Sequence, residues 1–182
     1  MKTRVLLSWS SGKDSAWALH VLRADPTVEL VGLLTSVNQT ASRVAMHAVR
    51  EGLLEAQAAA VGLPLTKVYI PQPWSNAEYE AATGAAVADA RQAGVTHVAF
   101  GDLFHDDLRA YREEKLAGSG IEPRFPIWGR PTADLSREMV GAGLRAVVTC
   151  VDPRQLDASF AGRIYDASLL DVLPDGVDPC GE

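Results

Sequence analysis

The segment SSGKDS, from Ser10 to Ser15, has the residue types of a phosphate-binding loop. It follows a short apolar run and opens a helical pattern, so the free N–H groups and positive dipole end of that helix would face the loop. Gly12 lets the backbone turn sharply and approach a ligand without an intervening side chain. Ser10, Ser11 and Ser15 supply hydroxyl donors. These features together predict an anion cradle best suited to phosphate.

Two charged residues of the loop suggest what it does with phosphate. Lys13 adds a positive charge that can follow a transferring group. Asp14 adds a carboxylate, which is out of place beside phosphate unless a cation lies between them. We therefore predict that Asp14 binds Mg²⁺, which bridges to the phosphates. The alternative for Asp14 taken alone is that it caps the helix.

The Walker A phosphate loop is excluded by two positions. That pattern requires a glycine five residues before the Gly-Lys pair and a Ser or Thr directly after it. This chain has Leu7 and Asp14 there, and it contains no GxGxxG dinucleotide motif. The loop therefore belongs to another class of phosphate site.

Composition sets the broad class of the chain. Its 182 residues are 47% apolar and 22% charged, which is typical of one globular domain with a sizeable core. The net charge of −6 argues against a nucleic-acid partner. The cysteines, Cys150 and Cys180, are too few for a disulfide framework and are predicted to be buried hydrophobic residues. No apolar run approaches the ~20 residues of a membrane span, so we expect a cytoplasmic protein without a membrane partner.

Short apolar runs alternate with longer helical patterns, which predicts a doubly wound parallel sheet covered by helices on both faces. The strands are expected at residues 4–8, 28–36, 65–70, 95–100 and 144–151. The helices are expected at residues 14–24, 44–61, 76–93, 104–117, 132–142 and 167–172. Residues 121–131 carry three prolines and predict an ordered loop. The ligand site should lie beyond the carboxyl ends of the strands, where the strand order reverses.

Several motifs carry a resemblance to a known family. SSGKDS resembles the SGGxDS pyrophosphate loop of the N-type ATP pyrophosphatases, with Ser11 at the position of the first glycine. Five later motifs are similar to the diphthine–ammonia ligase family of this superfamily: RVAMHAVR from Arg43, GDLFHDDLRAYREE from Gly101, FPIWGR from Phe125, TCVDP from Thr149 and GVDPCGE from Gly176. The resemblance extends over essentially the whole chain.

The resemblance implies a fold and a reaction. The fold is the adenine nucleotide alpha hydrolase-like (HUP) type with strand order 3-2-1-4-5, so the first and fourth strands are neighbours. The reaction consumes ATP with Mg²⁺, adenylates a carboxylate, releases pyrophosphate and lets ammonia displace AMP. Ammonia and a carboxylate acceptor, either a small molecule or a modified protein side chain, are the implied partners, and a homodimer is left open.

The resemblance also implies the site residues. The catalytic residues would be Lys13, Asp14 and Asp102, with Asp14 as the metal ligand. ATP would bind to Ser8, Ser10, Ser11, Gly12, Lys13, Asp14, Ser15, Thr35, Ser36, Gly101 and Asp102. The substrate would bind to His47, Arg109, Arg112, Glu113 and Glu182. Simpler alternatives stay open: Asp102 as a helix cap, the α-helical Arg and Glu residues as a solvated salt-bridged face, and His47 as a surface or core histidine.

The organisation implied is an ATP-binding domain, residues 1–151, and a C-terminal extension, residues 152–182. Family members continue past the Cys-Gly-Glu motif that ends at Glu182, so the extension is expected to be incomplete. This chain should then bind ATP but turn over poorly. Two other functions remain open. A tRNA-modifying enzyme of this superfamily would favour a basic extension and paired cysteines, and a nucleotide-binding module that never hydrolyses ATP would not need Asp14.

Overall fold

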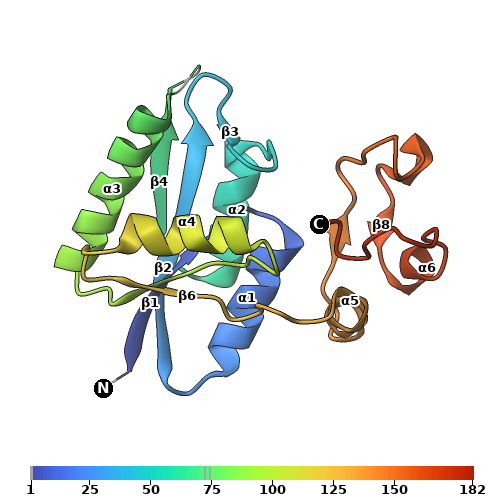
Figure 1. Cartoon of the computed structure of the whole chain (residues 1–182), viewed down its shortest axis with the longest axis horizontal. Coiled ribbons are helices and arrows are strands. Elements are labelled where there is room, and N and C mark those ends of the chain that lie inside the picture. The colour runs from blue at the N-terminus through green and yellow to red at the C-terminus, as the bar shows by residue number, and fades with distance from the viewer. Residues whose placement is uncertain (1, 72, 74) are drawn as a thin grey trace. The chain divides into compact units, whose positions relative to one another are not determined.

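The computed structural model describes residues 2–71, 73 and 75–182. The chain divides into two compact units, Met1–Trp128 and Gly129–Glu182 (Figure 1). The first unit contains the large sheet and its covering helices, and the second contains short helices and a two-stranded sheet. No helix within the described residues is both long enough and apolar enough to cross a membrane.

The sheet of the first unit has five parallel strands in the predicted order. Along the chain they are β1 (Thr3–Ser8), β2 (Val28–Asn38), β4 (Leu65–Ile70), β5 (His97–Ala99) and β6 (Glu122–Arg124). In space they run β4-β2-β1-β5-β6, which is 3-2-1-4-5 when the parallel strands are counted along the chain. The predicted fold class, an α/β protein of the HUP or Rossmann-like type, is confirmed.

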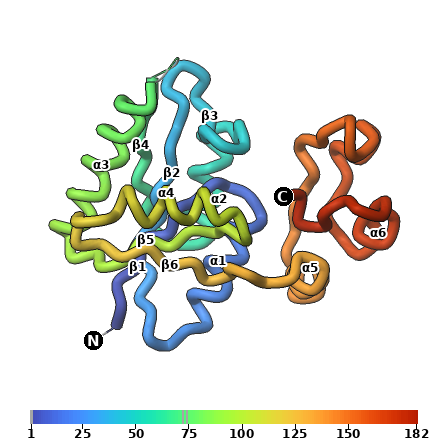
Figure 2. The backbone as a smooth tube through the Cα atoms, viewed as in Figure 1, coloured from blue at the N-terminus to red at the C-terminus, as the bar shows by residue number. Residues whose placement is uncertain are grey.

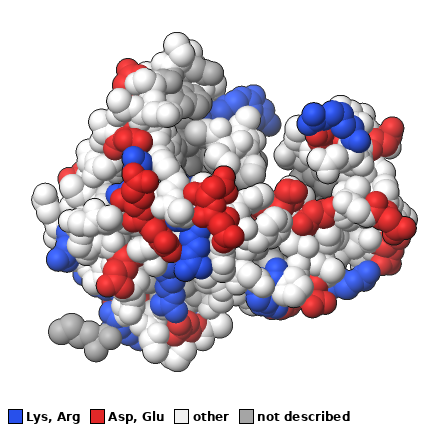
Figure 3. All heavy atoms as spheres, in the orientation of Figure 1, with Lys and Arg blue, Asp and Glu red and all other residues white. Residues whose placement is uncertain are grey.

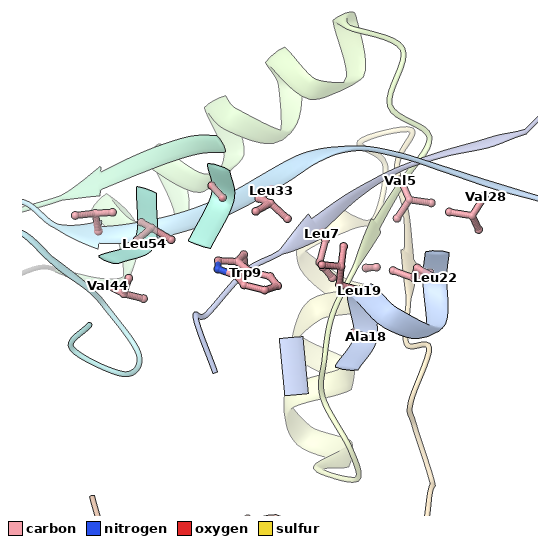
Figure 4. Close-up of a cluster of buried hydrophobic side chains, with 13 residues drawn as sticks. Val5, Leu7, Trp9, Ala18, Leu19, Leu22, Val28, Leu33, Val44 and Leu54 are labelled. Carbon is pink, nitrogen blue, oxygen red and sulfur yellow. The ribbon is translucent and has the colours of Figure 1, made fainter. Parts of the chain in front are cut away.

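Helices cover both faces of this sheet. On one face lie α1 (Lys13–Ala24) and α2 (Glu51–Val61), and on the other α3 (Asn76–Gln92) and α4 (Asp106–Leu116). Successive residues of a strand point to opposite faces, so Val5 and Leu7 of β1 pack with α1 and α2 while Leu6 packs on the other side. Figure 4 shows Leu19 and Leu22 of α1 against these strand residues. Burying one such side chain contributes about 1.5–3 kcal/mol.

The fifth strand of the sheet was predicted in the wrong place. Only Ala146–Val147 (β7) of the predicted strand is extended, and it pairs antiparallel with Ile164–Tyr165 (β8) in the second unit. The fifth parallel strand is β6, within the proline-rich segment predicted as a loop. Pro123 is tolerated because β6 is an edge strand, and the ladder is held by Glu122 N–H to the Thr96 carbonyl and Phe100 N–H to the Arg124 carbonyl.

The helix predicted at residues 44–61 begins seven residues later. After β2 the chain folds back as β3 (Arg43–Val44), which pairs antiparallel with the end of β2. Ala48 then adopts a left-handed conformation, with φ of 52°, which a helix interior cannot contain. The remaining predicted helices agree within two residues at each end. The backbone trace in Figure 2 follows the β1-α1-β2 crossover that presents the loop.

The second unit has its own small core. Tyr165, Leu169 and Leu170 pack with partly buried residues around α5 (Thr132–Gly141) and α6 (Ala167–Leu170); a 3₁₀ turn covers Ala158–Phe160. The division between the units lies after residue 128, whereas the sequence patterns predicted it after residue 151, because residues 144–151 join this core instead of the large sheet. Cys180 is buried as predicted. The same prediction for Cys150 is wrong, since that residue is exposed.

Candidate functional site

The loop between β1 and α1 opens the helix without a side-chain cap. Gly12 is the N-cap residue, and Asp14 is the second residue of α1. The alternative that Asp14 caps the helix is therefore wrong. Its carboxylate instead accepts two hydrogen bonds from Lys13 Nζ, at 2.8 and 2.9 Å. The charged pair lies at the positive end of the helix dipole.

The tight turn of the loop is made by Ser11, not by Gly12. Ser11 has a φ of 68°, whereas Gly12 is extended with a φ of −90°. Gly12 is needed for space instead, because a Cβ atom there would come within 2.7 Å of His47 Nε2 and 3.3 Å of Ser10 Oγ. This close approach brings His47, from the segment between β3 and α2, against the loop.

The three serines of the loop differ in what their hydroxyls bind. Ser15 is buried and donates to the Gly12 carbonyl oxygen at 2.9 Å. Ser10 Oγ accepts from Gly12 N at 3.3 Å and donates to Ser15 Oγ at 3.2 Å. Ser11 Oγ is buried and has no hydrogen-bond partner among the described residues. Buried polar atoms are rarely left unpaired, so Ser11 offers the one loop hydroxyl that is not already used to shape the loop.

The segment after β5 lies directly against the start of α1. A Cβ atom on Gly101 would come within 2.9 Å of both the Asp14 carbonyl carbon and the Ser15 nitrogen. The predicted meeting of the loop with Gly101 and Asp102 is therefore found in the structure. Asp102 is not a helix cap, because α4 begins at Asp106 with His105 as its N-cap residue.

Asp102 is a partly buried carboxylate whose Oδ2 atom is shielded from water. Its Oδ2 atom has no hydrogen-bond partner among the described residues, and Arg112 Nε lies 3.6 Å away, an ion-pair distance that is too long for a good hydrogen bond. Burial raises the pKa of Asp102, Arg112 lowers it in part, and the negative charge of Asp14 raises it further. The surroundings of Asp102 therefore favour a neutralising cation.

The acidic residues fit Mg²⁺ that arrives with phosphates. Mg²⁺ commonly takes one or two carboxylates and completes its shell with phosphate oxygens and water. Asp14 and Asp102 supply two carboxylates from the segments that follow the neighbouring strands β1 and β5, and Asp102 Oδ2 accepts no hydrogen bond from the described residues. Within the described residues no group of three or more metal-ligating side chains is found. The two carboxylates therefore fit a metal ion that phosphate oxygens also bind better than one bound by protein side chains alone.

Three of the residues predicted to bind ATP, at the ends of β1 and β2, help to hold the sheet together. β1 ends at Ser8, which lies beside Leu34 of β2. The Thr35 hydroxyl is buried and donates to the Trp9 carbonyl oxygen at 2.7 Å. The Ser36 carbonyl accepts from Ala45 N–H at 2.9 Å. Because its hydroxyl is buried and bonded to Trp9, Thr35 could contact ATP only through its backbone.

The charged residues of α4 separate into two groups. Arg112 faces Asp102, and its guanidinium lies 4.8 Å from the centre of the Phe100 ring. Arg109 pairs with Glu113 at 2.8 Å and stacks over two aromatic rings, at 4.9 Å from Phe125 and 5.0 Å from Trp128. Figure 3 shows acidic and basic side chains interleaved on the visible face of this unit. The solvated salt-bridge alternative describes Arg109 and Glu113 better than it describes Arg112. The remaining predicted substrate residue, Glu182, lies in the second unit.

One residue beside the loop was missed in the sequence. Gln57 of α2 accepts from Trp9 Nε1 at 3.3 Å and donates to the Ser11 carbonyl at 3.4 Å. It links the helix to the strained residue of the loop. The available signal was a polar residue between Leu54 and Ala58, which are both buried.

Comparison with known families agrees with this geometry. The family model described as the diphthamide synthase N-terminal domain matches residues 1–121. The chain belongs to this family. It is a PP-loop family within the N-type ATP pyrophosphatase superfamily, so the chain is an ATP-using enzyme domain of the adenine nucleotide alpha hydrolase-like type. No match was found among curated proteins. The matched residues include the loop, Asp102 and all of α4, and end just before β6.

Proposed function

We propose that this chain is an ATP-dependent amide-forming ligase. A carboxylate oxygen of the acceptor attacks the α-phosphorus of ATP, the bond to the bridging oxygen breaks, and pyrophosphate leaves. Ammonia then attacks the acyl carbon, loses a proton, and displaces AMP. The observation that supports this proposal is the approach of Gly101 and Asp102 to a phosphate loop that lacks Walker features and carries Asp14.

The residues of the loop take distinct roles in this proposal. The free N–H groups at the start of α1 and the unpaired Ser11 hydroxyl bind the phosphates that leave as pyrophosphate. Lys13 exchanges its contact with Asp14 for a phosphate oxygen and follows the leaving group. Asp14 and Asp102 hold Mg²⁺, which neutralises phosphate charge when it is bound. His47, which lies against Gly12, is close enough to the loop to contact the bound phosphates.

The acceptor is proposed to be a carboxylate bound by Arg109 of α4. A guanidinium recognises a carboxylate through paired, charge-assisted hydrogen bonds. Arg109 is presented on aromatic rings, and Arg112 lies beside Asp102. Diphthine, the modified residue from which diphthamide is made, is the acceptor that the family name suggests. Another carboxylate of similar shape would use the same contacts.

The products made from ATP test this proposal. The chain is incubated with α-labelled ATP, Mg²⁺, ammonium and a diphthine-bearing protein, and nucleotides are separated by chromatography. AMP and pyrophosphate are expected in equal amounts, and an acceptor with ¹⁸O in its carboxylate should transfer one ¹⁸O to AMP. ADP and inorganic phosphate would overturn the proposal. Tight ATP binding with no AMP under any of these conditions would instead favour a nucleotide-binding module.

A further inference from the structure

Arg112 contacts both residues that flank Gly101 in the chain. Its guanidinium lies over the ring of Phe100, 4.8 Å from the centroid, and its Nε lies 3.6 Å from Asp102 Oδ2. Phe100 and Asp102 are the residues that flank Gly101 in the chain. The side chain of Arg112 is 22% exposed and that of Asp102 is 16% exposed, so both groups are mostly removed from water.

The same three-residue segment is fixed from its other side by α1. Gly101 is so close to the backbone of Asp14 and Ser15 that a methyl group would not fit there. The segment is thus held between the first turn of α1 and the guanidinium of Arg112. Asp102 has no hydrogen bond to Oδ2 among the residues that the structure describes, so Arg112 is the contact that orients this oxygen.

The Phe100 ring in turn restrains the guanidinium. Phe100 stacks on Phe125, with ring centres 5.7 Å apart, and Leu116 of α4 packs in the same hydrophobic cluster. A planar guanidinium over an aromatic face loses less freedom than a lysine ammonium would in the same position. Arg112 therefore reaches Asp102 from a rigid support.

We propose that Arg112 is a positioning residue that acts through Asp102: it holds the Phe100–Asp102 segment against α1 and so sets how strongly the site binds Mg²⁺ together with ATP. This inference rests on the proposed function, which assigns Asp102 to the metal. Arg112 itself need not touch the nucleotide. Its contribution depends on the Asp102 carboxylate being present.

A double-mutant cycle tests this dependence. The dissociation constants of ATP with Mg²⁺ and of ATP with EDTA are measured by calorimetry for wild type, Arg112→Gln, Asp102→Asn and the double variant. Arg112→Gln should weaken Mg²⁺·ATP by about tenfold, as for one charge-assisted contact, and should change metal-free ATP much less. In the Asp102→Asn background the same substitution should have no further effect. Arg112→Lys should restore part of the loss, because it keeps the charge.

The matched control is Lys115→Gln on the same helix. Lys115 also pairs with a carboxylate, Glu80 at 2.9 Å, and lies over a ring, that of Tyr111 at 5.4 Å, and neither partner belongs to the 100–102 segment. It should leave both dissociation constants unchanged. Circular dichroism melts of every variant confirm folding, and if Arg112→Gln does not fold, the cycle is built with Arg112→Lys.

The outcomes separate the two proposals. Two outcomes would overturn the inference alone. In the first, Asp102→Asn weakens binding of Mg²⁺·ATP, but the effects of the two substitutions add in the double variant. In the second, Arg112→Gln weakens the binding of ATP equally with and without Mg²⁺. Unchanged Mg²⁺·ATP binding in Asp102→Asn would overturn both the inference and the assignment of Asp102 to the metal. The product test for AMP stands independently of either result.

Discussion

Gly101 and Asp14 touch through their backbones: a methyl group on Gly101 would lie 2.9 Å from the carbonyl carbon of Asp14. β1 and β5 are neighbours in the sheet, and this contact joins the segments that follow them. A side chain at position 101 cannot be accommodated by a small local movement, because the atoms it would meet belong to the main chain of α1. The distance between the two acidic residues of the site is thereby fixed by the fold itself.

Gly101→Ala should lower the free energy of unfolding by about 1–3 kcal/mol, the usual cost of overpacking a fixed interior. Chemical denaturation measures it. Gly12→Ala is the comparison, because its new methyl group would meet mainly the end of the His47 side chain, which can move. That variant should remain within about 1 kcal/mol of wild type. Equal losses in both variants would show that the α1 contact is not rigid.

Ser11→Gly should stabilise the fold by up to about 1 kcal/mol. A non-glycine residue in the left-handed region costs about 1–2 kcal/mol of folding free energy. Glycine removes this strain, but it also raises the conformational entropy of the unfolded chain, which offsets part of the gain. Ser11→Ala keeps the strain and removes the hydroxyl. Both variants should bind ATP more weakly if the hydroxyl contacts phosphate. Wild-type affinity in Ser11→Ala would show that the hydroxyl has no ligand.

Asp14→Asn should weaken Mg²⁺-dependent ATP binding while the fold survives. The carboxylate pairs with the adjacent Lys13 and lies in the first turn of α1. Loss of its charge there should cost less than about 1 kcal/mol of stability. Titration with ATP in Mg²⁺ and in EDTA measures the metal-dependent part. Retention of that part in full would exclude Asp14 as a metal ligand.

Asp102→Asn should unfold at a higher temperature than wild type at neutral pH in EDTA. Burial raises the pKa of Asp102 above 3.8, so the folded state holds its proton more tightly than the unfolded state does. Wild-type stability therefore falls as the pH rises from about 3.8 through the folded pKa. The advantage of the Asn variant should shrink on acidification and vanish below the unfolded pKa. A wild type that is more stable at pH 7 would contradict this.

Arg109→Ala should lower kcat/KM for the acceptor by ten- to a hundredfold, the loss of a charge-assisted contact of about 1.5–3 kcal/mol. It should also cost about 1 kcal/mol of stability through its two ring contacts. Lys115→Ala is the matched control on the same helix and should lose only stability. Unchanged kinetics in Arg109→Ala would assign this residue to packing alone.

The phosphate loop could be predicted from the local pattern of Ser10–Ser15, whereas the strand order could be predicted only through the resemblance to the N-type ATP pyrophosphatases, because right-handed crossovers alone leave several topologies open. The sequence was not sufficient for β6, since a strand that contains Pro123 is recognised only when its place at the sheet edge is known. The residues on either side of β6 within 121–131 are turn and irregular structure, as predicted. The local propensity of this segment favours a loop, and its place at the edge of the sheet makes it a strand.

Some features of the site could likewise be predicted from the sequence, and others could not. The approach of Gly101 and Asp102 to the loop could be predicted from strand order, which brings the ends of β1 and β5 together. The left-handed conformation of Ser11 and the separation of Arg112 from Arg109 could not, because helical spacing alone puts both arginines on one face. Their separation depends on where Phe100 and Phe125 lie.

The proline of β6 also limits how this protein can associate. Glu122 N–H and the Arg124 carbonyl are bonded inward to the neighbouring chain segments, so the outward position of the strand is that of Pro123, which has no N–H to donate. A strand from a second molecule laid along this edge would find a missing rung at its centre. Natural sheets use this device against edge-to-edge aggregation. A homodimer of this chain is therefore not expected to form by continuing the sheet past β6.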